Sequence, residues 1–279
     1  SSFARIQADA DTLTLAGTID SSTNSSTSVV LQGASAITVT GQVTGSGGLI
    51  SGSANVGPGS IRTVSNDTNN FTGRAQASGG VLAFTSVANA GTASALGAGT
   101  VTPTIGLASG TSNATLSYIG TDPLGHSTTR DINLGSGTLG DHTATIEANG
   151  TGPLGLGPVS STTTGTKTLV LTGTNTGGNS IGAITPGTAT AVSVTKDGAG
   201  TWILTGANTY AGNTTVNNGT LALADNAQLK FVLGATSGVN NSLSGAGTVS
   251  LEGDFVIDTA AADSLPSGSW TLENVTTLP

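Results

Sequence analysis

The feature that most constrains the fold of this chain is a segment that recurs along it. Residues 198–223 read GAGTWILTGANTYAGNTTVNNGTLAL, and their Asn-Thr-Tyr-Ala-Gly (208–212) aligns with Asn-Asn-Phe-Thr-Gly (69–73). Recurrence at intervals of tens of residues is typical of a stacked solenoid. Partial copies of the segment occupy residues 57–84, 165–176 and 245–253.

Each copy consists of short predicted strands. The runs 202–204 (Trp-Ile-Leu) and 220–223 (Thr-Leu-Ala-Leu) are β-prone, with apolar residues at alternate positions. Glycines flank these runs, and Asn-Asn-Gly at 217–219 is a compact turn signal. Strands this short cannot bury a core alone, so we expect them to stack within one all-β solenoid that covers residues 1–279.

The composition supports this reading and excludes several classes of function. The chain has 43 glycines and only 8% charged residues, and no stretch sustains the apolar period of a helix. Its 7 basic residues are scattered singly in a chain of net charge −8, so we predict no nucleic-acid binding. No apolar run approaches the roughly 18 to 20 residues of a membrane span, so none is predicted. The absence of cysteine excludes disulfides and thiolate metal sites.

The repeat itself resembles a known family. Residues 198–212, followed by Thr-Thr-Val (214–216) and Gly-Thr-Leu (219–221), are similar to the autotransporter-associated β-strand repeat, also called the passenger-associated transport repeat. Residues 229–272 also resemble the C-terminal passenger region of long secreted repeat proteins. The resemblance implies a right-handed, single-stranded parallel β-helix, with irregular turns, on the exterior of a bacterial cell.

In such a helix, equivalent residues stack in columns at about 4.8 Å per turn. At roughly 20 to 25 residues per turn, the chain would form on the order of 11 to 14 turns. Stacked asparagines can form amide ladders at the corners, and Asn69, Asn175 and Asn208 are the candidates. The alternative is that these asparagines are ordinary polar turn residues.

The two ends of a β-helix expose unpaired strand edges, which invite pairing with another chain. We therefore predict head-to-tail association through the runs 3–15 and 270–278. The predicted assembly residues are Phe3, Ile6, Leu13, Leu15, Trp270, Leu272, Val275 and Leu278.

The ionisable residues indicate little chemistry. His126 and His142 are predicted to be solvated loop residues. Asp9 and Asp11 would share one face of a strand, which suits a cation, but no third ligand is close in sequence. We expect solvated carboxylates there, and no catalytic residue, metal or cofactor. The same applies to the pairs Glu252/Asp254 and Asp258/Asp263.

Glycan binding and ice binding are two further surface functions on which the residues bear. Trp202 and Tyr210 are expected to pack between turns, although exposed aromatics would instead favour binding of surface glycans. Thr-x-Thr pairs are typical of ice-binding β-solenoids, but their spacing along the chain is too uneven to predict one flat array. These pairs are Thr12/Thr14, Thr38/Thr40, Thr143/Thr145 and Thr188/Thr190.

The leading hypothesis is an extracellular, non-enzymatic structural protein, a β-helical surface rod or filament subunit. The alternative is a passenger-type adhesin or carbohydrate-binding surface protein. A polysaccharide-acting enzyme is a third reading, which the small number of ionisable residues disfavours.

Overall fold

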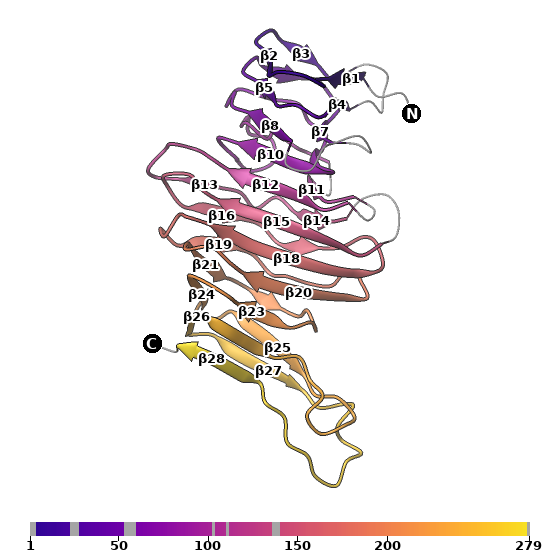
Figure 1. The fold of residues 1–279 in the computed structure, drawn as a ribbon, viewed down its shortest axis with the longest axis vertical. Coiled ribbons are helices and arrows are strands. Elements are labelled where there is room, and N and C mark those ends of the chain that lie inside the picture. Colours follow the sequence, from indigo (N-terminus) through magenta and orange to yellow (C-terminus); the bar gives the residue numbers. More distant parts are fainter. Residues whose placement is uncertain are drawn as a thin grey trace.

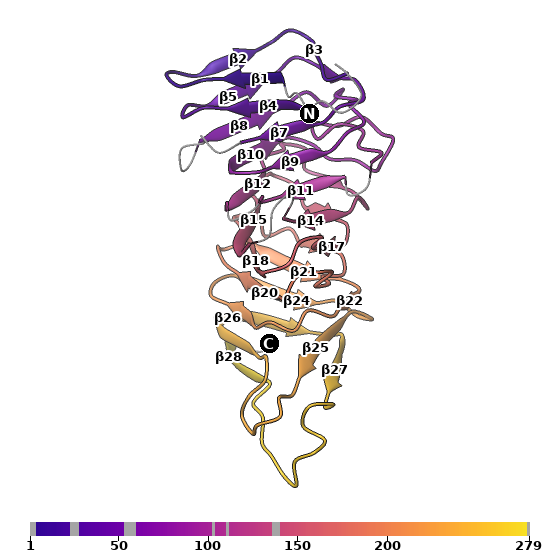
Figure 2. The ribbon, with the colours of Figure 1, turned by 90° about the vertical axis from the view of Figure 1, so that its right-hand side faces the viewer.

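The computed structural model describes residues 4–22, 28–52, 60–101, 104–109, 112–135 and 140–277. Phe3 and Leu278 lie outside these ranges. The described residues form strands and no helix, and the strands pair in parallel. They wind as a coil with three faces, here called A, B and C, which the chain visits in that order (Figures 1 and 2). The predicted parallel β-helix is therefore confirmed.

Face A begins with a seven-stranded ladder and continues, through the single bridging residue Ile184, into a three-stranded one. The two ladders lie on one side of the coil in Figure 2. The strands of the first ladder are β1 (Ala4–Gln7), β4 (Val29–Gln32), β7 (Leu49–Ser51), β9 (Ala75–Ala77), β11 (Ile105–Leu107), β14 (Ile132–Leu134) and β17 (Val159–Ser160). Those of the second are β22 (Ala207–Asn208), β25 (Gln228–Val232) and β27 (Asp254–Asp258).

Face B is the longest ladder, and eleven described strands stack along it. The chain length predicts on the order of 11 to 14 turns, and the number of strands agrees with the lower end of this range. The strands are β2 (Leu13–Leu15), β5 (Ile37–Val39), β8 (Ile61–Val64), β10 (Gly80–Phe84), β12 (Ala114–Tyr118), β15 (His142–Ala148), β18 (Thr166–Gly173), β20 (Ala191–Lys196), β23 (Thr214–Val216), β26 (Leu243–Leu251) and β28 (Glu273–Thr277).

Face C is interrupted near its start and regular in the second half of the chain. Strand β26 is long enough to serve two faces, because its first residues pair with β23 and its last four with β24. The strands of face C are β3 (Ile19–Asp20), β6 (Val43–Thr44), β13 (His126–Ser127), β16 (Leu154–Leu156), β19 (Asn179–Ile181), β21 (Thr201–Leu204) and β24 (Thr220–Leu223), followed by the second half of β26.

Alternation along each strand sends every second side chain into one continuous core. In β15 and β18 buried residues alternate without a break with half-buried or exposed ones. In-register pairing then stacks like on like, so Leu82, Leu116, Ile146 and Leu171 form a buried column inside face B. Each such side chain contributes about 1.5 to 3 kcal/mol of burial free energy. The core is thus a row of columns along the axis.

The turns differ in length, which explains the irregular spacing of the repeat. Register partners lie 20 residues apart at Ile61 and Val81, but 34 apart at Gly80 and Ala114. Loops at the corners absorb the difference, while the strands remain in register. Sequence spacing therefore does not report which residues are stacked.

The repeat at 198–223 is one complete turn plus the strand that follows it. Its first strand, β21, lies directly against its last, β24, with Trp202 opposite Leu221 and Leu204 opposite Leu223. In the copy at 57–84, β8 pairs with β10 in the same way, but on face B and not on face C. The copies therefore share the path of one turn, although they start from different faces.

Candidate assembly edges and surface sites

The edge at the start of the described chain is formed by β1, β2 and β3. The side chains of Ile6, Leu13 and Leu15 are half-buried and pack against the core. These three predicted assembly residues thus close the first turn, while the outer backbone edges of β1 and β2 have no partner among the described strands.

The opposite edge is formed by β27 and β28. Leu272 and Val275 pack partly against the core, and the Trp270 indole N–H donates a 3.2 Å hydrogen bond to the Thr236 carbonyl. Trp270 thereby joins the two loops 233–242 and 259–272, which project beyond the rod in Figures 1 and 2. Of these predicted residues, Trp270 and Leu272 therefore lie in a loop, and Val275 lies in β28.

Strand β27 carries an apolar surface that the sequence prediction missed. Phe255, Val256 and Ile257 are 46%, 39% and 41% exposed, so both sides of the strand reach solvent. The Phe255 ring contacts Phe231 edge to face, with 5.5 Å between ring centroids. The signal was present in the sequence, because DFVID at 254–258 is a strand-like run like those that fill the core elsewhere.

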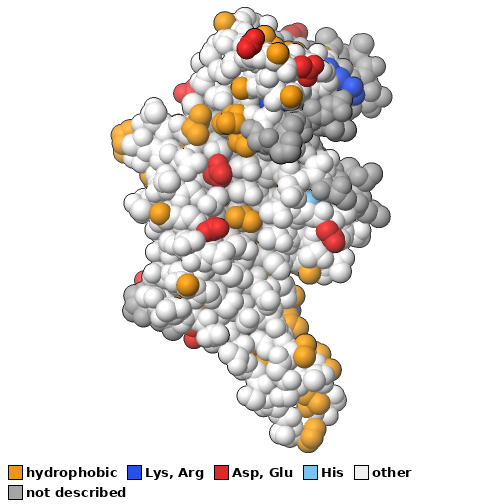
Figure 3. All heavy atoms as spheres, in the orientation of Figure 1, with side chains coloured by type: hydrophobic (Ala, Val, Ile, Leu, Met, Phe, Trp, Pro, Cys, Tyr) orange, Lys and Arg blue, Asp and Glu red, His pale blue; other side chains and the backbone are white. Residues whose placement is uncertain are grey.

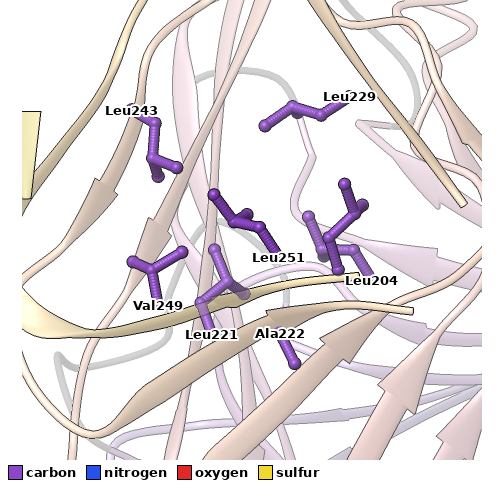
Figure 4. A pocket seen from close by; sticks show the side chains of 8 residues that line it. Leu204, Leu221, Ala222, Leu229, Leu243, Val249 and Leu251 are labelled. Atoms are coloured by element: carbon purple, nitrogen blue, oxygen red, sulfur yellow. The ribbon is translucent and has the colours of Figure 1, made fainter. Parts of the chain in front are cut away.

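The core ends in an apolar cavity behind this edge. Figure 4 shows leucine and valine side chains from β21, β24, β25 and β26 gathered around it. The cavity has no charged lining residue, so it is a part of the core and not a candidate for chemistry. Its lining residues are Leu204, Leu221, Ala222, Leu223, Leu229, Leu243, Val249 and Leu251.

Buried asparagines connect successive turns. Asn208 Oδ1 accepts a 3.0 Å hydrogen bond from Ile184 N–H in the turn before, and Nδ2 donates a 3.0 Å bond to the Gln228 carbonyl in the turn after. Asn69 makes the equivalent pair with Val43 N–H and the Ala95 carbonyl. These amides therefore bond to backbone groups above and below.

Asn175, the third candidate, behaves differently from Asn69 and Asn208. Among the described residues, its Nδ2 donates to carbonyls of the preceding turn alone, those of Gly150, Thr151 and Gly152. The three-turn bridge is made instead by Asn179, which accepts from Leu154 N–H and donates to the Thr201 carbonyl. Asn179 had not been predicted, because it lies outside the aligned part of the copy at 165–176.

The aromatic residues of the repeat are interior. Trp202 and Tyr210 are fully buried, which confirms that they pack between turns. The Trp202 indole N–H donates a 2.9 Å hydrogen bond to the Thr172 carbonyl of the preceding turn, and the Tyr210 hydroxyl lies 2.7 Å from Thr214 Oγ1. These rings therefore present no face to a sugar.

Comparison with known proteins supports what the repeat and its stacking indicate. Residues 194–223 match the family described as the Passenger-associated-transport-repeat. The chain carries this repeat. The Adhesin BmaC autotransporter of Brucella suis biovar 1 (strain 1330) is 34% identical over 149 residues, which is 52% of this chain and 4% of that protein. No solved structure matches significantly.

The passenger-associated transport repeat and the similarity to an autotransporter indicate a secreted bacterial protein of the cell surface. The chain spans only a small fraction of the relative's length. Within the described ranges, no helix is long and apolar enough to cross a membrane.

Lys196, within the matched residues 194–223, is one of four basic residues that are buried without a carboxylate hydrogen-bond partner in the described part of the chain. Lys196 Nζ donates to the carbonyls of Asp197, Gly198 and Asn218 at 2.6, 2.8 and 3.0 Å. Burial lowers the pKa of Lys196 to about 8, and the Asp197 carboxylate opposes this shift. The cation thus holds together the corner at which the repeat begins.

The other three buried cations also donate hydrogen bonds to backbone carbonyls. The Arg130 guanidinium donates to the carbonyls of Leu96, Gly97 and Thr104, and burial lowers its pKa to about 10. Arg62 and Lys167 likewise bond to backbone carbonyls, and burial lowers the pKa of each. Four of the seven basic residues are therefore structural.

The histidines do not lie in solvated loops, so that prediction was wrong. His142 is the first residue of β15 and is 6% exposed, because the alternation HTATIEA turns it inward with Ala144 and Ile146. His126 belongs to β13 and is half-buried, with its ring edge-on to Tyr118.

The acidic pairs also depart from the expected strand geometry. Asp9 and Asp11 are exposed in the bend between β1 and β2, so they do not share a strand face. Asp258 forms a 2.8 Å salt bridge with Lys230 on the neighbouring strand β25. Among the described residues, no group of three His, Asp or Glu side chains could hold a metal ion. Glu252, Asp254 and Asp263 are exposed.

Proposed function

We propose that this chain is a rod-forming segment of the passenger of a bacterial surface adhesin, with a structural and non-enzymatic role. The observation that carries the proposal is that the passenger-associated transport repeat forms one whole in-register turn of the β-helix. The relative named as an adhesin supports the adhesive context. We further propose that residues 1–279 behave as one solenoid unit.

The distribution of ionisable groups supports a non-enzymatic role. A polysaccharide-acting site needs convergent carboxylates with a nearby base or cation. In the described part of the chain, Arg62, Arg130, Lys167 and Lys196 are instead buried against backbone carbonyls.

The test is performed on intact cells of the producing strain. External protease is expected to release fragments of this chain without lysis, and deletion of its coding segment is expected to reduce attachment to host cells or matrix. Protection from external protease would contradict the surface location. Unchanged attachment, with the rest of the passenger still displayed, would contradict the adhesive role.

A second proposal is end-to-end association with another copy, for which exposed Phe255, Val256 and Ile257 on β27 are the supporting observation. Both edges carry acidic groups, including Asp9 near the first edge and Glu273 in β28. Like charges repel, and salt screens them, so association should increase with ionic strength. Sedimentation at low and high salt tests this, and a monomer at every salt concentration would contradict it. Surface glycans are the alternative partner, to be tested by glycan-array binding.

A further inference from the structure

Face B carries two columns of small side chains on its outer surface, all of them Thr or Ser except Val170. The columns cross the strands β12 to β26 in the widest part of the rod, where β15 and β18 are the longest neighbouring strands (Figure 1). Register pairing places the residues of each column directly against one another. The first column is Thr143, Thr168 and Ser193, and the second is Thr115, Thr145, Val170, Thr195, Thr215 and Ser244.

These columns form a two-dimensional lattice. Neighbouring parallel strands lie about 4.8 Å apart, and successive side chains on one face of a strand are spaced about 6.6 Å apart. The registers of β12, β15, β18 and β20 continue without a bulge. The uneven spacing of threonines in the sequence is thus converted into regular stacking. This removes the objection that arose from the sequence, although of the four Thr-x-Thr pairs only Thr143/Thr145 contributes both residues.

The hydroxyls of the lattice are available to solvent. Within the described residues, those of Thr143, Thr145, Thr168 and Thr195 form no hydrogen bond to protein, and all four side chains are half-exposed. Some threonines outside the lattice do bond to protein, since Thr205 Oγ1 donates a 2.9 Å hydrogen bond to the Ile181 carbonyl. The hydroxyls of the four lattice threonines are therefore left for an external partner.

Charge is sparse on and around the lattice. Glu147 lies at its margin, opposite Thr172, and Asp141 lies in a shallow hollow beside Thr143 and Thr168. Figure 3 shows that this side of the molecule is dominated by uncharged polar side chains and backbone. An uncharged ligand is therefore favoured over an ionic one.

We propose that this face binds ice. A hydrogen bond that replaces one to water contributes only about 0.5 to 1.5 kcal/mol, so a ligand must engage many hydroxyls simultaneously. A crystalline water surface repeats in two dimensions and can do so. Soluble sugars gain much of their affinity from aromatic stacking, and the two columns contain no aromatic residue. Threonine and Val170 also supply methyl groups between the hydroxyls.

The experiment measures partition of the fluorescently labelled protein into a slowly grown ice hemisphere. The intact chain is expected to concentrate in the ice, whereas Thr195→Lys, at the centre of the second column, is expected to be excluded like an inert protein. Ser250→Lys is the matched control, since Ser250 is also a half-exposed outward residue but lies on face C. Circular dichroism establishes that each variant is folded.

Three outcomes would overturn the proposal. The first is exclusion of the unmodified chain from ice. The second is equal incorporation of the folded Thr195→Lys and Ser250→Lys variants. The third is exclusion from ice together with retention on insoluble cellulose or chitin that Thr195→Lys abolishes, which would assign the lattice to a polysaccharide. If Thr195→Lys does not fold, Thr168→Lys in the first column replaces it, with the same expected exclusion from ice.

Discussion

Asn69 and Asn208 make the same pair of hydrogen bonds on two different faces of the helix. Each accepts from an N–H of the preceding turn and donates to a carbonyl of the following turn. A single side chain thus links the backbone of three successive turns. This position of the repeat requires asparagine, because the bridge needs a hydrogen-bond acceptor and a donor on one short, planar side chain.

The first prediction concerns this bridge. Asn208→Ala should lower the free energy of unfolding by about 1 to 3 kcal/mol, since it removes the side-chain hydrogen bonds to the Ile184 N–H and the Gln228 carbonyl. Asn217→Ala is the control, because Asn217 is exposed and its side chain has no hydrogen bond among the described residues. Urea unfolding measures both. Equal midpoints for the two variants would refute the bridge.

The second prediction concerns the repeat as a unit of one turn. Deletion of residues 201–219 joins Gly200 to Thr220 and places β24 where β21 was, with Leu221 and Leu223 at the inward positions of Trp202 and Leu204. We expect a cooperatively folded protein that melts within about 10 °C of the parent, because solenoid turns contact only their neighbours. Deletion of 201–210 removes a partial turn and should prevent cooperative folding. Similar melting curves for both deletions would contradict the modular turn.

The third prediction follows from the lowered pKa of Lys196. The folded state releases this proton near pH 8, whereas the unfolded state holds it to about pH 10.4. The unfolded state therefore binds more protons between these values, so the contribution of Lys196 makes stability rise with pH there.

Lys196→Met should remove this contribution. The variant is expected to gain less stability than the parent between pH 7.5 and pH 10, by about 1 to 3 kcal/mol. Denaturant midpoints at the two pH values measure the difference. Lys230→Met, which loses a partly exposed ammonium, is the control and should retain the slope of the parent. An unchanged slope in Lys196→Met would show that Lys196 is not the group responsible.

The fourth prediction concerns the contact between Gly97 and Phe71. Gly97 has φ +68°, and a Cβ at this position would lie 2.6 Å from the buried Phe71 ring. Gly97→Ala should therefore destabilise the protein by at least about 2 kcal/mol, through both backbone strain and overpacking. Gly17→Ala is the control, since nothing lies within 4 Å of a Cβ there. Calorimetry would exclude this explanation if both variants melted alike.

The sequence was sufficient to predict the class of fold but not the assignment of residues to faces. Alternation in 202–204 and 220–223 predicted stacked strands, and Trp202 is buried as expected. The stacking partners depend on the number of residues in each corner loop, which a local pattern does not encode. For this reason the threonines of face B appeared too unevenly spaced to align.

Some of the missed residues had a readable signal. Lys167 alternates in phase with Leu169 and Leu171 in the run TKTLVLT, and Arg62 is in phase with Val64, so both could have been predicted to point inward. This periodicity conflicts with the general tendency of cations to be exposed. The carbonyls that receive them come from other turns and corners, and only the folded structure brings them together.

The buried cations determine how charge is distributed over the surface of the protein. Of 7 basic residues against 15 acidic ones, Arg62, Arg130, Lys167 and Lys196 are enclosed by backbone dipoles. Only Arg5, Arg74 and Lys230 remain to offset the carboxylates at the surface. The net charge stays at −8, but a membrane or neighbouring rod in contact with the surface meets mainly carboxylates and few cations. Parallel rods crowded on one cell would hold each other apart, over distances set by the ionic strength of the medium.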